Sequence, residues 1–246
     1  MSFKGIRAIH IAVAVFWLLV WELAAFLVDA GILLVSPRVT FVRLTELART
    51  QLFWASIGMS LQRILLGFVL ALTIGVLLAS AASKWKTVHS FVQPLVNIMN
   101  AIPIASFVVI ALLAFSSRNL PVFISVVMVM PIVFHNTMNG IRSADVGMLE
   151  MARVFRVSLW KRAYYIYFKT AMPFVLSAAS VGIGIAWKSG ISAELIGIVP
   201  GTIGQNLHQA RVFLQTADVF AWTVTIVLLS FAMEKLFKKL FDRLSE

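Results

Sequence analysis

The chain has 246 residues, of which 61% are hydrophobic and 13% are charged. Because soluble domains average about 25% charged residues, this composition excludes an ordinary soluble globule and indicates a membrane protein. The formal net charge is +11. The basic residues stand in short clusters beside apolar runs, which is typical of membrane topology signals and not of a nucleic-acid-binding face. The absence of cysteine excludes disulfides, thiolate metal sites and a cysteine nucleophile.

Six apolar segments are long enough to cross a bilayer, since about 20 apolar residues span the hydrocarbon core as a helix. Helices are expected because an open strand cannot satisfy its backbone polar groups in lipid. The sequence therefore predicts an all-α, polytopic membrane protein whose six helices form a single transmembrane domain, residues 1–246. The predicted spans are about Ile9–Val28, Ser56–Ala82, Phe91–Phe115 (with Pro94 and Pro103 inside), Leu120–Gly140, Phe174–Ile198 and Ala217–Phe237.

The first predicted span follows Lys4 and Arg7, as the apolar part of a signal peptide would. Its apolar run is longer than the roughly 7–15 residues of a signal peptide, and five more spans follow. We therefore expect it to be a retained helix. In the segment Asp29–Ala55 that comes next, Ser36 and Pro37 precede a mixed run, Val39–Arg49, for which a short surface helix is predicted.

The distribution of basic residues predicts the orientation. With the N-terminus inside, the inner segments carry 14 of the 21 Lys and Arg residues and the outer segments carry 6. The remaining one, Lys188, lies within the fifth span. Because Lys and Arg accumulate in cytoplasmic loops, we expect both termini to be cytoplasmic, together with the loop of about residues 141–173 between the fourth and fifth spans.

The loop 141–173 holds six of the basic residues. Its residue types predict a first helix over Glu150–Phe155, a turn, and a second helix over Leu159–Lys169 that Ser158 caps. Pro173 is expected to end the loop and to open the fifth span, since proline is favoured in a first helical turn. Charge and aromatic content alone favour an amphipathic loop that lies on the membrane surface and contacts anionic headgroups.

The loop also holds Glu150, Ala152, Trp160, Ile166 and Pro173 in that order. This order resembles the EAA loop of the permease subunits of ATP-binding cassette importers, in which Glu-Ala-Ala, three residues, Gly and nine residues precede Ile-x-Leu-Pro. Trp160, together with the pair Met172 and Pro173, fits additions that are common in the nitrate, sulfonate, taurine and bicarbonate branch. The chain departs from the signature at Met151, Arg156, Phe168 and Lys169, which replace Ala, Gly, Leu and Pro.

The resemblance extends from about residue 56 to residue 194. The segment that begins at Ser60 and includes Arg63 and Gly67 resembles the start of the second helix in that branch. The pairs Ala186-Trp187 and Ala193-Glu194 resemble its fifth helix. Gln93-Pro94-Leu95, followed by Ile102-Pro103, resembles the pattern of the third helix in the same branch.

The resemblance implies a permease subunit of an importer in a prokaryotic cytoplasmic membrane, moving a small anionic solute by alternating access. It implies that a separate ATPase uses the ATP, that this chain binds no cofactor, and that an extracytoplasmic solute-binding protein and a second permease copy are partners. The lipid membrane is the remaining partner, and nucleic acid is not one. The residues that would couple to the ATPase are Glu150, Ala152, Arg153, Arg156, Ser158, Trp160, Ile166 and Pro173.

Arg156 stands where the family has glycine. Glycine serves where a helix ends in the left-handed region, and a side chain there costs on the order of 1 kcal/mol. We predict that the turn is kept and that Arg156 contacts the ATPase or lipid headgroups.

Polar residues inside the spans are candidates for a translocation path, because ionisable groups at membrane depth usually face an interior route. Lys188 and Glu194 are six residues apart, so they point about 240° apart on an ideal helix. Asn100 and Asn136 are further candidates, with interhelical hydrogen bonding as the alternative. For Glu194 the alternative is a local pair near the outer interface. No metal site is expected.

Motifs of an enzyme are missing from the sequence. It contains no GxxxxGK[ST] phosphate loop, no HExxH and no GxSxG, so the chain is not expected to hydrolyse ATP or to be an enzyme. The alternatives are a self-contained secondary transporter or channel, and a membrane-integral enzyme or assembly factor. Secondary transporters often contain paired repeats, and none is evident here.

Overall fold

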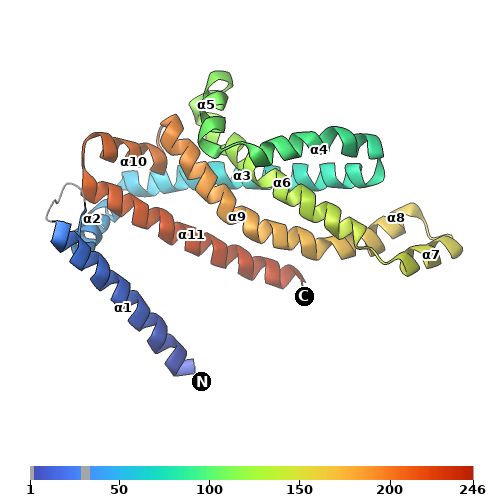
Figure 1. The fold of residues 1–246 in the computed structure, drawn as a ribbon, viewed down its shortest axis with the longest axis horizontal. Helices are drawn as coiled ribbons and strands as arrows, with labels where there is room; N and C mark the ends of the chain where they lie inside the picture. Colours follow the sequence, from blue (N-terminus) through green and yellow to red (C-terminus); the bar gives the residue numbers. More distant parts are fainter. Residues whose placement is uncertain (1–2, 29–33, 246) are drawn as a thin grey trace.

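The computed structural model describes residues 3–28 and 34–245, and all the regular elements in these ranges are helical (Figure 1). The all-α class is therefore confirmed. The long helices run side by side along the molecule, α1 diverges from them, and α7 and α8 project at one end. The elements are α1 (Phe3–Val28), α2 (Pro37–Ala48), α3 (Gln51–Lys84), α4 (Lys86–Ala101), α5 (Ile104–Ala114), the 3₁₀ turn η1 (Ser117–Asn119), α6 (Leu120–Arg142), α7 (Val146–Val154), α8 (Leu159–Arg162), the π-helical segment η2 (Ala163–Phe168), α9 (Lys169–Gly197), α10 (Ile203–Val212) and α11 (Thr216–Ser245).

Four continuous helices in the described part of the chain are long and apolar enough to cross a membrane. They cover Gln51–Lys84, Ser117–Arg142, Leu159–Gly197 and Thr216–Phe241. The bent pair α4 and α5 makes a fifth if it is counted as one span. Within α1 the apolar stretch Ala12–Val28 is shorter. The structure thus supports a multi-pass helical protein, and six spans with both termini inside stay a prediction.

The core forms where α6 packs between α3 and α9. Ile64 and Phe68 of α3 and Phe134 of α6 are fully buried with Trp187 of α9. The Trp187 indole Nε1–H donates to the backbone oxygen of Ile226 in α11 at 3.0 Å, so α11 is attached to the same core. Small residues allow these helices to approach closely, as in other membrane bundles.

The third predicted span is not one helix, and the prediction of a single helix over Phe91–Phe115 is wrong. The chain bends by 113° between α4 and α5. Proline disfavours helical backbone at the residue before it, and Ile102 accordingly has an extended ψ of 127° before Pro103, which is the N-cap of α5.

The fifth predicted span begins earlier than expected. Pro173 lies inside α9, and the helix continues without a break from Leu159 through η2 to Gly197. The prediction that Pro173 opens this span is therefore wrong. A proline in a helix removes one backbone donor and crowds the preceding turn. Here the π-helical segment η2, which is wider than an α-helix, directly precedes α9, the helix that contains Pro173.

Two short helices lie at the end of the molecule opposite α7 and α8 (Figure 1). The predicted surface helix is present as α2, where the Ser36 side chain accepts a hydrogen bond from the Val39 N–H. The sequence reading missed α10. Its signal is Thr202 followed three residues later by Gln205, and the Thr202 hydroxyl accepts from the Gln205 N–H at 3.3 Å.

Candidate functional site

The α7–α8 loop begins with a capped helix. Asp145 precedes α7, and its Oδ1 accepts hydrogen bonds from the N–H groups of Gly147 at 2.6 Å and Met148 at 3.2 Å. This cap satisfies two of the free N–H groups at the helix start, so α7 has a defined first turn.

The end of α7 is a Schellman motif with Arg156 in the left-handed position. Arg156 has φ +50°, and its N–H donates to the Arg153 carbonyl at 3.0 Å. The Val157 N–H donates to the Ala152 carbonyl at 2.9 Å. These are the two hydrogen bonds that define the motif, in which glycine is the usual left-handed residue. The predicted turn is therefore kept with arginine in the place of glycine.

A small core holds the turn in place. Ala144, Ala152 and Ile166 are buried together, and Val157 packs against them. After the turn, Ser158 accepts from the Lys161 N–H at 3.5 Å and caps α8, as the sequence predicted. Two of the candidate coupling residues, Ala152 and Ile166, thus have packing roles inside the loop.

The outer face of the loop is apolar and exposed. Val154, Phe155, Leu159 and Trp160 are each at least 75% exposed. They flank the turn at Arg156, on the part of the molecule that projects from the long helices (Figure 1). A cluster of large apolar side chains at a projecting tip is typical of a surface that another protein or a membrane covers.

In the described part of the loop, the charged residues that are candidates for coupling to the ATPase do not form ion pairs with one another. Glu150, Arg153 and Arg156 are exposed, and within the described residues no ion pair joins Glu150 to either arginine. Pro173 lies away from the turn, within α9.

The four candidate path residues lie in different environments. Lys188 and Asn100 are exposed on the surface of the chain, and Asn136 is partly buried with its Nδ2 donating to the Ile132 carbonyl of its own helix at 2.9 Å. Glu194 is fully buried. No hydrogen bond or ion pair links any two of them in the part of the chain that the structure describes.

Glu194 is the centre of a hydrogen-bonded cluster at the opposite end from the loop. Its Oε2 accepts from the Ser60 hydroxyl of α3 at 2.8 Å and from the Gly204 N–H of α10 at 3.2 Å. The Ser60 oxygen in turn accepts from the Ile203 N–H at 3.0 Å. The cluster therefore joins α3, α9 and the start of α10, where free N–H groups and the helix dipole favour a carboxylate.

Two buried polar atoms complete this environment. Glu194 Oε1 and Nη1 of Arg63, which lies three residues after Ser60 on α3, have no hydrogen-bond partner among the described atoms. Residues three apart on a helix share a face, so the guanidinium lies on the side of α3 that carries Ser60. Ser60 and Arg63 lie in one segment that resembles the permease family and Glu194 lies in another, and the fold brings these two segments together.

The chain belongs to the family of binding-protein-dependent transport system inner membrane components, whose model matches residues 51–245. It is an ATP-binding cassette transporter permease. SsuC of Bacillus subtilis, which is named for the transport of aliphatic sulfonates, is 26% identical over 205 residues, covering 82% of this chain and 74% of SsuC. The taurine transport system permease protein TauC of Escherichia coli is 22% identical over 87% of this chain and 80% of TauC.

The fold is also found among solved structures. A crystal structure of an amino acid ABC transporter with histidines matches with a TM-score of 0.64 and 18% identity, over 83% of this chain and 95% of that one. The resemblance to this branch of permeases is thus confirmed at the level of family and fold.

Proposed function

We propose that this chain is the membrane-spanning subunit of an importer for a small anionic solute of the nitrate, sulfonate or taurine kind. A separate ATPase would drive its alternating access, an extracytoplasmic binding protein would deliver the solute, and a second copy of the permease would complete the path. The family and the names of the sulfonate and taurine relatives support this proposal. The membrane orientation in it follows from the distribution of basic residues.

The observation that carries the proposal is the projecting apolar face of the α7–α8 loop. Val154, Phe155, Leu159 and Trp160 surround a turn that caps, hydrogen bonds and a small core hold in one conformation. A pre-organised apolar surface loses little conformational freedom on binding, which suits a protein groove. In the proposed orientation this face is cytoplasmic, where the ATPase would contact it.

The loop is directly connected to the far end of the molecule. From Leu159 the chain is helical through η2 and α9 to Gly197, and Glu194 lies in the last turn of this helix. A displacement of the loop by the ATPase would therefore reach the Ser60 and α10 contacts of Glu194. In the same proposal the exposed Lys188 and Asn100 would face the solute path, which a second permease copy would enclose.

The experiment compares two phenylalanines in matched positions. Phe155 is the C-cap of α7 and precedes the left-handed Arg156, whereas Phe213 is the C-cap of α10 and precedes the left-handed Leu214 at the other end of the molecule. Both are at least 70% exposed. The permease is co-expressed with a candidate Walker A-containing ATPase taken from the neighbouring genes, and the amount of ATPase that co-purifies is measured.

Phe155→Ala should reduce ATPase co-purification by about tenfold or more, as at an interface hot spot, and Phe213→Ala should leave it unchanged. Equal co-purification with both variants would refute the docking role of this face. Solute uptake in liposomes by the permease alone, driven by a proton gradient, would refute the importer and support a secondary transporter instead.

A further inference from the structure

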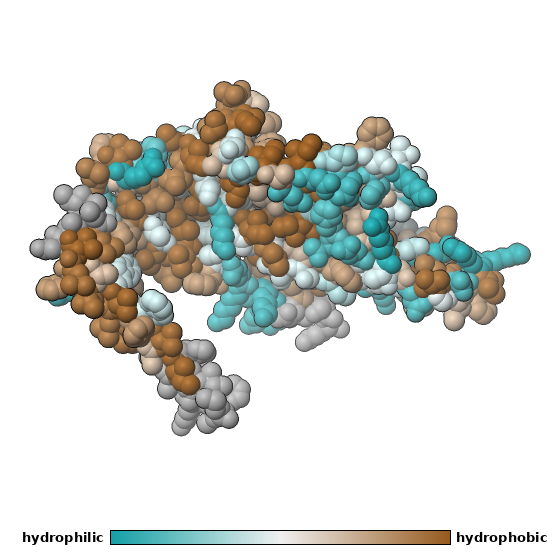
Figure 2. All heavy atoms as spheres, viewed as in Figure 1, coloured by the Kyte–Doolittle hydropathy of each residue, from teal (hydrophilic) through white to brown (hydrophobic). Residues whose placement is uncertain are grey.

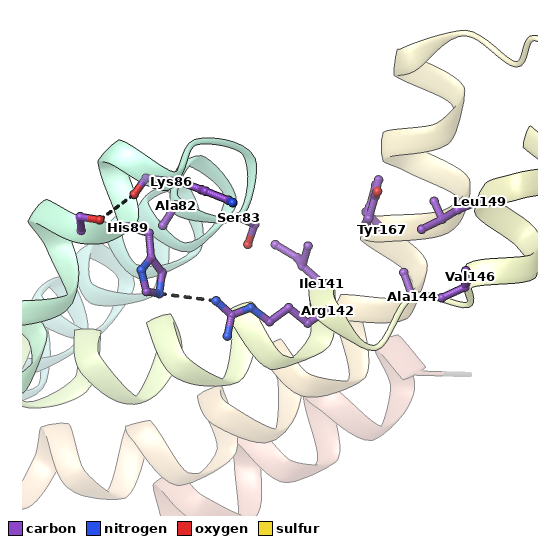
Figure 3. A pocket seen from close by; sticks show the side chains of 11 residues that line it. Ala82, Ser83, Lys86, His89, Ile141, Arg142, Ala144, Val146, Leu149 and Tyr167 are labelled. Carbon is purple, nitrogen blue, oxygen red and sulfur yellow. Dashed lines mark hydrogen bonds between the residues drawn. The ribbon is translucent and has the colours of Figure 1, made fainter. Parts of the chain in front are cut away.

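A cavity of about 580 Å³ lies beside the base of the α7–α8 loop (Figure 3). Its walls come from the end of α3, the first turns of α4, the end of α6, the start of α7 and Tyr167 of η2. Figure 2 shows that hydrophilic side chains gather at this end of the molecule, while apolar surface covers α1 and much of the long helices.

The lining of this cavity contains three basic residues. Lys86 and His89 of α4 and Arg142 of α6 line it, and none of its lining residues is acidic. Arg142 Nη2 lies 3.5 Å from His89 Nε2, within hydrogen-bonding distance, so side chains from two different helices meet there (Figure 3). Lys86 and Arg142 bring two positive charges to this lining, and an anion would supply the counter-charge that the lining residues lack.

An acidic residue that neighbours the cavity lining in sequence caps a helix instead. Asp145 lies between the lining residues Ala144 and Val146, and its Oδ1 accepts from the N–H groups of Gly147 and Met148 at the start of α7. In the described residues no ion pair involves Lys86 or Arg142.

We propose that this cavity binds an oxyanion, a phosphate or sulfonate group, between Lys86, His89 and Arg142. Guanidinium and ammonium donors form the strongest hydrogen bonds with such groups, and the guanidinium can bind two oxygens at once. The Tyr167 side chain lies at the opposite wall, and Val146 and Leu149 supply an apolar side next to the anion. The size of the cavity suits a headgroup or a small organic anion.

Two sources of this anion share the same chemistry. One is the headgroup phosphate of an anionic phospholipid, since basic pockets at the inner side of membrane proteins bind such lipids. The other is a free oxyanion in solution. Either one would join the α3–α4 turn and the end of α6 to the first turn of α7, and would thereby stabilise the base of the loop.

The test uses the full-length chain in nanodiscs and two probes. In nanodiscs of phosphatidylcholine, inorganic sulfate and phosphate are titrated while the unfolding temperature is followed by tryptophan fluorescence. In nanodiscs that contain phosphatidylglycerol, the lipid retained after transfer to detergent is measured by native mass spectrometry. The variants are Lys86→Gln and Arg142→Gln, and the control is Lys84→Gln, which removes a charge close by but outside the cavity lining.

A saturable rise in the unfolding temperature identifies a free oxyanion, and retained phosphatidylglycerol identifies a lipid. In either case Lys86→Gln and Arg142→Gln should each weaken binding by about tenfold or more, and Lys84→Gln should not. The proposal is overturned if neither probe binds the wild-type chain, if binding persists in a variant that carries both Lys86→Gln and Arg142→Gln, or if the control weakens binding equally. Unfolding temperatures without anion check that each variant is folded.

Discussion

The hydroxyl of Ser60 donates to the Glu194 carboxylate at 2.8 Å and accepts from the Ile203 N–H at 3.0 Å, so one side chain joins three helices. Both side chains are fully buried. A buried donor or acceptor that loses its partner costs about 1–3 kcal/mol, because it was taken out of water to make that contact. The Ser60–Glu194 pair is therefore expected to fix the start of α10 against α3.

Ser60→Ala should lower the free energy of unfolding by about 1–3 kcal/mol, since it leaves both the Glu194 oxygen and the Ile203 N–H without this partner. Ser80→Ala is the control, because the exposed Ser80 hydroxyl bonds only to the Val76 carbonyl of its own helix. Denaturant titration of the purified chain in mixed micelles measures the difference. Equal stability of the two variants would show that the cluster does not hold α10.

Gly204→Ala should also lower the free energy of unfolding. A Cβ at Gly204 would lie 2.3 Å from the Glu194 Cβ and 2.6 Å from backbone atoms of Glu194 and Leu195, which cannot move as a flexible side chain can. Overpacking of this kind typically costs about 1–3 kcal/mol and separates the start of α10 from the carboxylate. Gly58→Ala, where nothing lies within 4 Å of the added carbon, should be neutral or slightly stabilising. A lower thermal unfolding midpoint for the Gly204 variant alone is the expected result.

Arg156 provides a test of the left-handed turn. Arg156→Val puts a β-branched residue at φ +50° and should destabilise the turn by about 1–2 kcal/mol, whereas Arg156→Gly should retain it. Arg153→Val removes the same charge from helical backbone and is the matched control. Hydrogen exchange of the α7–α8 amides measures the effect. Protection that is lost equally in both valine variants would mean that charge, and not backbone conformation, is responsible.

The ion pair of Arg43 and Asp218 joins α2 to the start of α11. Arg43 Nε donates to Asp218 Oδ1 and Nη2 donates to Oδ2 at 3.0 Å, while Nη1 donates to Glu46 at 2.8 Å. Asp218→Asn should lower the free energy of unfolding by about 1 kcal/mol. Glu46→Gln should lower it by less, because Glu46 is the more exposed partner of Arg43. Unfolding titrations of both variants, at low salt and at about 1 M salt, should show this difference shrink with salt. A larger loss from Glu46→Gln would contradict this order.

The pKa of Arg43 is raised above its ordinary value by its hydrogen bonds to Asp218 and, second, to Glu46. A base with a raised pKa contributes stability that is present below its unfolded pKa and lost only as the pH rises through its folded pKa. Because even the ordinary arginine pKa is above about 12, the pair should be unaffected between about pH 7 and pH 9. The expectation would be contradicted if the free energy of unfolding fell within this pH interval in the wild-type chain but not in Asp218→Asn.

Much of the fold could be predicted because lipid demands long apolar helices, and α3 and α6 begin and end within a few residues of their predicted spans. The start of α11 was also predicted, but this helix continues past Phe237 to Ser245. Hydropathy cannot show whether a proline breaks a helix. Pro103 ends α4 and Pro173 does not interrupt α9, because the outcome depends on the neighbouring turn and on packing. The α7–α8 turn could be predicted from two local signals, which are the Ser158 cap and the position where the family has glycine. The Glu194 cluster did not, because 134 residues separate it from Ser60 and no local pattern encodes that contact.

The uninterrupted helix from Leu159 to Gly197 has 39 residues. At about 1.5 Å per residue it is nearly 60 Å long, which exceeds the thickness of a bilayer with its headgroups. Tilting a straight helix of this length by about 5° about one end displaces its other end by about 5 Å. In the orientation proposed above, a spectroscopic label placed on α10 would then report movements of the proposed ATPase from the opposite face of the membrane.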